Sequence, residues 1–125
     1  MNTDTAGYLL LIHEPVGQRA TRTEAEGREA YARMRRFAEA IAAQNQLAAV
    51  ESLAGLDRAT RIERGALRDG PFAEAKEMVG GFFLLRHVTR EQALEWARRC
   101  PAAEWATVEV RALGPCFLES TARIG

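Results

Sequence analysis

Two segments of the chain, 8–13 and 79–88, are apolar along most of their length rather than at alternate positions. A strand with this pattern needs cover on both of its faces. The chain has only two long helical patterns, and two helices cover one face of a small sheet. We therefore expect a sheet with helices on one side and a second apolar face that requires another partner.

The two helical segments are marked by capping boxes, Thr23-x-x-Glu26 and Thr89-x-x-Gln92, which predict where each helix begins. The first helix is expected at about 24–46, and the second ends before a proline. Apolar residues at three-to-four spacing predict the buried faces: Tyr31, Met34, Phe37, Ala38 and Ile41 in the first helix, and Ala93, Trp96, Ala97 and Cys100 in the second.

Two more strands are predicted at 47–53 and 105–113, and a small hairpin near 58–68 turns at Arg64-Gly65. The resulting order is strand, helix, strand, strand, helix, strand, with the hairpin as an addition. This order predicts an α+β fold of the ferredoxin-like type, an antiparallel sheet with two helices on one face. Each copy would leave one apolar sheet face in water. We therefore expect two copies to pair through these faces in a symmetric homodimer.

Length and composition fit one globular domain that spans the 125 residues, with flanking tails at 1–6 and about 115–125. The chain is 47% hydrophobic and carries 17 basic and 17 acidic residues, so its net charge is zero. This balance argues against direct binding of nucleic acid. No stretch approaches the length of a membrane span and no signal peptide is visible, so we expect a cytoplasmic protein without membrane contact.

The residues that commonly bind metals and cofactors are sparse. His13 and His87 lack metal-ligand spacing, and Cys100 and Cys116 form no CxxC pair, so no metal site is expected. The cysteines are expected to be free thiols, with Cys100 a packing residue at a helix end. No glycine-rich phosphate-binding pattern is present, and no cofactor is predicted.

The segment Asp69-Gly-Pro-Phe-Ala-Glu-Ala-Lys-Glu77, followed by Gly80-Gly81-Phe-Phe, resembles the signature of the DGPF family of the YCII-related superfamily. The segments 93–101 and 108–111 resemble the end of that family, and the first strand fits its beginning. The resemblance covers about 7–113. It implies a dimeric α/β barrel among small bacterial proteins, most of them without an assigned activity.

The same resemblance implies two different functions. Some relatives are associated with extracytoplasmic-function sigma factors, which favours a non-catalytic regulatory or interaction protein. A few distant relatives are dehalogenases, or are suspected enzymes that use a His–Asp pair. Their histidine follows the first strand, whereas this chain has no histidine within 14–46.

Asp69 has both a structural and a catalytic interpretation. An aspartate before Gly-Pro accepts hydrogen bonds from nearby backbone N–H groups and fixes a turn, which is the favoured interpretation. As a general base, it would need a proton-bearing partner at a pocket, for which His13 or Arg111 are the candidates. If the protein is an enzyme, Asp69 and His13 are its predicted catalytic residues, with transfer of a proton as the expected step.

Gly80-Gly81, Glu109 and Arg111 are the predicted ligand-binding residues. The glycines indicate a bulge or a close approach of two backbones, and a ligand cradle is the alternative. Glu109 and Arg111 share the strand face opposite Val108, where they either line a cleft for a small molecule or pair with each other or with Arg86. The leading hypothesis is a small polar or aromatic ligand in a cleft near the dimer interface.

Overall fold

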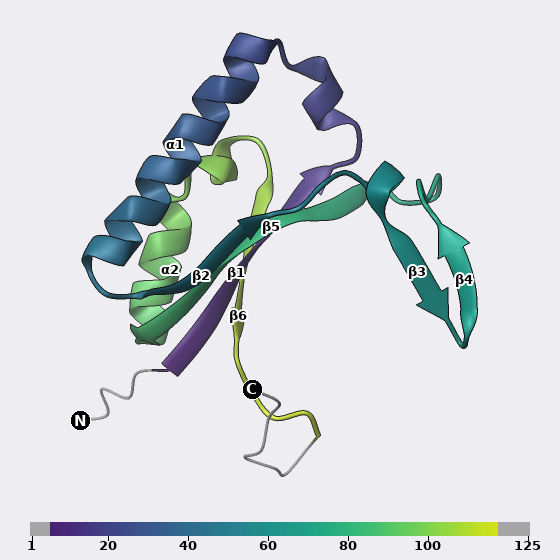
Figure 1. Cartoon of the computed structure of the whole chain (residues 1–125). Helices are drawn as coiled ribbons and strands as arrows, with labels where there is room; N and C mark the ends of the chain where they lie inside the picture. Colours follow the sequence, from purple (N-terminus) through teal and green to yellow (C-terminus); the bar gives the residue numbers. More distant parts are fainter. Residues whose placement is uncertain (1–5, 118–125) are drawn as a thin grey trace.

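The computed structural model describes residues 6–117, so the predicted tails lie almost entirely outside the described residues. Its main elements are, in chain order, β1 (Ala6–Pro15), α1 (Glu24–Ala43), β2 (Leu47–Ser52), β5 (Glu77–Val88), α2 (Arg90–Arg99) and β6 (Thr107–Ala112). Figure 1 shows both helices on the same side of the sheet. Among the described residues, no helix is long and apolar enough to cross a membrane.

The four main strands form one sheet in the order β2-β5-β1-β6, and every neighbouring pair is antiparallel. Strands that are adjacent in this sheet come from distant parts of the chain, because each helix carries the chain back across the sheet. The predicted ferredoxin-like α+β fold is confirmed. The strand-rich insertion between β2 and β5 is the predicted extra hairpin.

Both helices begin at the predicted capping boxes. The Thr23 side chain accepts from the N–H of Glu26, and the Thr89 side chain accepts from the N–H of Gln92, with each glutamate or glutamine side chain returning the bond. The first helix ends at Ala43, three residues before the predicted end. Asn45 adopts a left-handed φ of 58°, and the N–H of Gln46 bonds to the carbonyl of Ile41, which is a Schellman ending.

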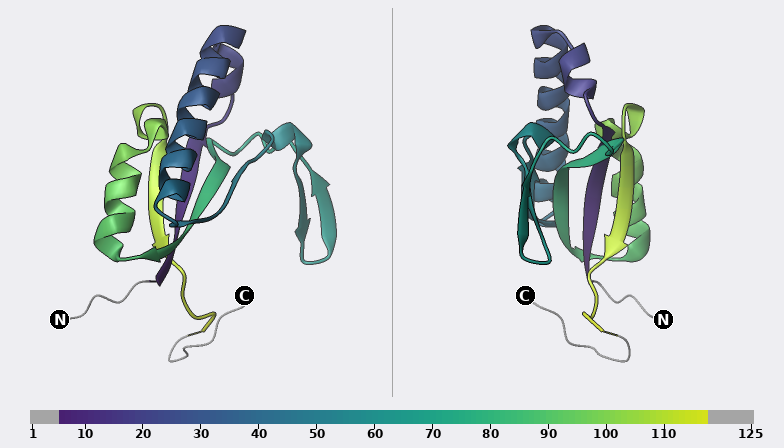
Figure 2. Two further views of the ribbon diagram at one scale, coloured as in Figure 1. Left: turned by 60° about the vertical axis from the view of Figure 1, so that its left-hand side comes forward. Right: turned by 90° about the vertical axis from the view of Figure 1, so that its right-hand side faces the viewer.

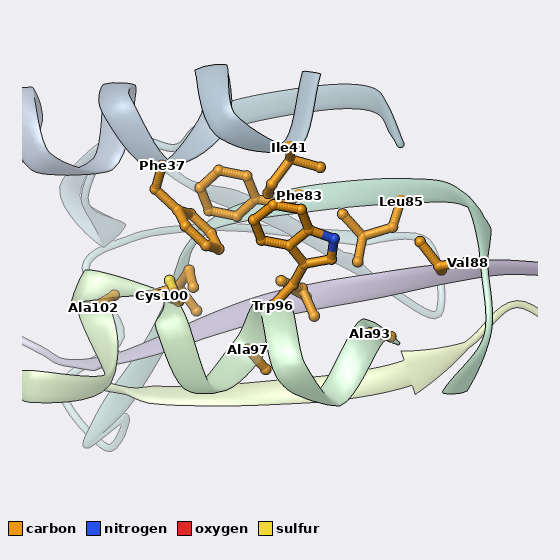
Figure 3. Packing of buried hydrophobic residues seen from close by; sticks show 12 residues of the cluster. Phe37, Ile41, Phe83, Leu85, Val88, Ala93, Trp96, Ala97, Cys100 and Ala102 are labelled. Atoms are coloured by element: carbon orange, nitrogen blue, oxygen red, sulfur yellow. The ribbon is translucent and has the colours of Figure 1, made fainter. Parts of the chain in front are cut away.

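The hydrophobic core lies between the helices and one sheet face (Figure 3). Phe37 from α1 makes edge-to-face contacts with Phe83 of β5 and Trp96 of α2, at ring-centroid distances of 5.1 and 5.9 Å. The Trp96 indole N–H donates to Oε1 of Gln46 at 2.8 Å, which satisfies the buried polar atom. This cluster holds the C-terminal half of α1 firmly on the sheet.

The hairpin of β3 (Thr60–Glu63) and β4 (Ala66–Asp69) projects from the body of the domain, as Figures 1 and 2 show from three directions. Its two-residue turn has positive φ at Arg64 and Gly65, 51° and 86°, which is the arrangement that suits the twist of paired strands. All eight residues of the two strands are exposed. The hairpin is anchored at its base by Phe72, which is 2% exposed and lies under the Arg61 guanidinium, 3.7 Å from the ring centroid.

The sheet face away from the helices is apolar at its centre. Leu9 pairs in register with Leu84, and Leu11 with Phe82, and the four side chains remain only half-buried. We call these four residues the open face. Within residues 6–117 the two helices cover the other side of the sheet, as the apolar pattern predicts.

Candidate functional site

A cavity of about 660 Å³ lies between the N-terminal half of α1 and the helix-covered side of the sheet. Its walls are mainly apolar and come from α1, three strands and the segment before β6. These apolar residues are Ile12, Ala30, Tyr31, Met34, Ala38, Val50, Phe82, Phe83, Ala102 and Trp105. A volume of this size accommodates a small organic molecule.

The cavity exists because α1 contacts the core through one half only. Phe37 and Ile41 are buried, whereas Tyr31, predicted on the same buried face, is 65% exposed. The prediction for Tyr31 is wrong because the N-terminal half of the helix stands away from the sheet. Tyr31 and Met34 therefore line the cavity instead of filling it.

The buried polar group of the cavity is the carboxylate of Glu14, which is 7% exposed. Arg19, in the short 3-10 helix η1 (Gln18–Thr21), binds this carboxylate through Nε and Nη2, both at 2.9 Å. The same guanidinium donates to the carbonyl oxygens of Leu53 at 2.7 Å and Gly80 at 3.2 Å. One arginine thus ties together the ends of β1, β2 and β5 at the floor of the cavity.

Gly80 and Gly81 provide the room for this arrangement. The pairing of β1 with β5 shifts between Ile12 and His13 and skips Gly80, so the predicted bulge is confirmed. A Cβ at Gly80 would lie 1.7 Å from Oε1 of Glu14, and one at Gly81 would lie 2.9 Å from the carbonyl oxygen of Glu51. Both glycines also line the cavity, where their role as ligand-binding residues stays a prediction.

Sequence reasoning missed Glu14 and Arg19 as site residues. The signal was present, because Glu14 occupies the position after Leu10 and Ile12 in the alternation of β1 toward the helices. A carboxylate at an inward position needs a buried partner. The partner follows five residues later, on a segment whose 3-10 conformation the sequence pattern does not reveal.

The predicted residues His13, Glu109 and Arg111 meet on the other side of the sheet. The Nε2 of His13 lies 2.6 Å from Oε1 of Glu109, and the Nε of Arg111 donates to Oε2 of Glu109 at 2.8 Å. These two hydrogen bonds, the one with His13 first, hold the pKa of Glu109 below its ordinary value. The alternative in which Glu109 pairs with Arg111 is therefore observed, whereas Arg86 bonds to Asn45.

Asp69 lies apart from this cluster, at the end of β4 in the hairpin. Its carboxylate accepts from Oγ1 of Thr60 at 2.6 Å, across the two-stranded pairing. The predicted bonds from its own loop are replaced by this cross-strand bond, because Asp69 is still part of the strand. Asp69 does not line the cavity, and His13 pairs with Glu109 rather than with Asp69.

The thiol of Cys100 is buried beneath the helices, and burial raises its pKa to about 11. A thiol with so high a pKa is a poor nucleophile, which agrees with a packing role. Among residues 6–117, no cluster of three or more histidine, cysteine, aspartate or glutamate side chains is placed to hold a metal ion.

The sequence matches the family model of the YCII-related domain over residues 8–116. This match covers most of the chain and begins and ends close to the limits of the described fold. The chain therefore belongs to the YCII-related family. The narrower assignment to the DGPF family stays a prediction, and a search of the curated proteins finds no match.

Proposed function

We propose that this YCII-related domain binds a small molecule with an apolar or aromatic body in the cavity beneath α1. The observation that carries the proposal is the union of an apolar cavity of about 660 Å³ with one buried, charge-paired carboxylate at its floor. Specific ligand pockets combine these features, since apolar walls supply affinity and few polar groups supply orientation.

The location differs from that of the cleft predicted from the sequence. The predicted cleft would use His13, Asp69, Glu109 and Arg111, and none of them lines the cavity. We therefore assign the binding role to the helix-covered side, and proton transfer by Asp69 or His13 is not part of this proposal. Glu14 is the carboxylate that a bound molecule would reach.

The proposal is tested with a substitution that fills the cavity with a large side chain. A Cβ at Gly27 would meet no atom within 4 Å, and Gly27 lines the cavity. Gly27→Phe is expected to abolish binding of aromatic probes, because its ring would fill the cavity. Thermal shift measures this loss, since a ligand raises the unfolding temperature only when it binds the folded chain. Gly27→Ala is the matched control, and equal loss of binding in both variants would contradict the proposal.

We also propose that the open face binds a second copy of the chain. Its support is the cross-strand apolar pairing of Leu9 with Leu84 and Leu11 with Phe82 on a face without helices. A sheet face of this kind is more apolar than a monomer keeps in water, and a second identical face is self-complementary. The ligand cavity lies on the helix-covered side of the sheet, and Phe82 is the residue of the open face that also borders it.

A further inference from the structure

The charge balance at the floor of the cavity points to the class of ligand. Glu14 and Arg19 neutralise each other through two hydrogen bonds of 2.9 Å. At the mouth, Glu24 pairs with Arg28 and Arg35 with Glu39. Arg22 and Glu51 also line the cavity and form no ion pair among the described residues, so only the charges at the inner end are fully compensated. A ligand with a net charge at its inner end would leave water without gaining an opposite charge.

The hydrogen-bonding capacity of the pair is not exhausted. An ionised carboxylate has about four lone-pair positions, and Arg19 occupies two of those of Glu14. A guanidinium has five N–H donors. Among the described residues, Arg19 uses two on Glu14 and one each on Leu53 and Gly80. The Glu14 carboxylate therefore keeps acceptor positions, and Arg19, whose side chain is 41% exposed, keeps one N–H on Nη1 among the described residues.

We infer that the cavity selects molecules whose inner end is a neutral group that both donates and accepts hydrogen bonds, such as a carboxamide, attached to an aromatic or apolar body. This inference rests on the proposed function, because it assumes that the cavity is the binding site. A carboxylate head has acceptors only and would face the lone pairs of Glu14. An ammonium head has donors only and would face the N–H groups of Arg19.

Three probes of one shape test the inference: benzamide, benzoate and benzylammonium. Binding of each to the wild-type chain is measured by NMR titration. Benzamide is expected to bind at least about tenfold more tightly than either charged probe, since burial of an uncompensated charge is costly. If benzoate or benzylammonium binds as tightly as benzamide, the inference is overturned while the proposed cavity function stands.

A variant supplies the second arm of the test. Glu14→Gln leaves the charge of Arg19 uncompensated, so the affinity for benzoate relative to benzamide is expected to rise about tenfold. Glu95→Gln is the matched control, because its carboxylate is 62% exposed, pairs with Arg98 and does not line the cavity. An unchanged preference in a folded Glu14→Gln variant overturns the inference. Failure of all three probes to bind the wild-type chain overturns both the inference and the proposed function.

Discussion

The carboxylate of Glu14 fills the space that a side chain at Gly80 would need, because a Cβ on residue 80 would lie 1.7 Å from Oε1 of Glu14. The glycine of the bulge in β5 is therefore a condition for the ion pair between the buried Glu14 carboxylate of β1 and the partly exposed Arg19 of η1. The floor of the cavity depends on a residue without a side chain in one strand and on a charged residue in its neighbour.

Gly80→Ala is expected to lower the free energy of unfolding by about 1–3 kcal/mol, because the added methyl group displaces the Glu14 carboxylate from Arg19. Chemical denaturation measures the change. The double variant Gly80→Ala with Glu14→Ala is expected to lose less than the two single losses combined, since the clash is then removed. Strict additivity would show that the two residues do not share this space.

Gly27→Ala is expected to raise the free energy of unfolding by about 0.5–1 kcal/mol, because alanine is the better helix former. The new methyl group meets open space, so no clash offsets the gain. The measurement is the midpoint of denaturation. A loss of stability would mean that the N-terminal half of α1 lies closer to the sheet and that the cavity is smaller.

The hydrogen bonds that Glu109 forms with His13 and Arg111 predict a pH-dependent contribution to stability. The pKa of Glu109 is lowered from 4.5, by the hydrogen bond with His13 first and then by that with Arg111. A carboxyl group whose pKa is lower in the folded state stabilises the fold at pH values above its ordinary pKa. This stabilisation is lost as the pH falls through the lowered pKa of the folded state. Wild type is therefore expected to exceed Glu109→Gln in stability near neutral pH and to converge with it in acid.

Chemical denaturation from about pH 7 to about pH 3 follows this convergence. Glu95→Gln is the control, because its carboxylate is 62% exposed and pairs only with the neighbouring Arg98 on α2 among the described residues. The interpretation fails if the difference between wild type and Glu109→Gln is the same at every pH.

The hydrogen bond of Asp69 with Thr60 predicts a local effect on the hairpin. Asp69→Ala is expected to speed the hydrogen exchange of the Gly70 N–H, which donates to the carbonyl of Ala59 at 2.7 Å. Asp69→Asn is expected to restore most of the protection, since its amide oxygen also accepts. If the exchange rate of the Gly70 N–H is the same in Asp69→Ala as in wild type, Asp69 does not stabilise the hairpin.

The open face predicts a homodimer that buries more than roughly 1,000 Å² in total. Leu11→Glu is expected to yield a monomer in sedimentation experiments, because the new charge would be buried in the interface. Tyr31→Glu is the control, since Tyr31 is 65% exposed on α1, on the helix-covered side of the sheet. A wild-type chain that sediments as a monomer at micromolar concentration would contradict the proposed pairing.

Most of the fold could be predicted, because the local signals for the strands and for the helix starts agree with the structure. The capping boxes predict both helix starts, and the strands with apolar residues on both faces, β1 and β5, lie in the middle of the sheet. The end of α1 was predicted too late, since a left-handed asparagine such as Asn45 is rarer than glycine at that position.

The site could be predicted only in part, because it depends on tertiary geometry. The pattern correctly placed Glu109 and Arg111 on one strand face, but the hydrogen bond with His13 comes from the register of β1 with β6. The cavity arises from the angle at which α1 leaves the sheet, and helical periodicity assigns Tyr31 to the core regardless of that angle. Glu14 was overlooked because a proline follows it and suggests the end of the strand.

The most direct test of the proposed binding cavity is an NMR titration of the uniformly labelled chain with benzamide, followed through its glycine amides. Gly27, Gly80 and Gly81 line the cavity, whereas Gly65 lies in the hairpin turn and Gly70 at the hairpin base. Binding beneath α1 predicts shifts for the first three amides and none for the other two. Shifts confined to the hairpin or to the open face, or no shifts at all, would contradict the account.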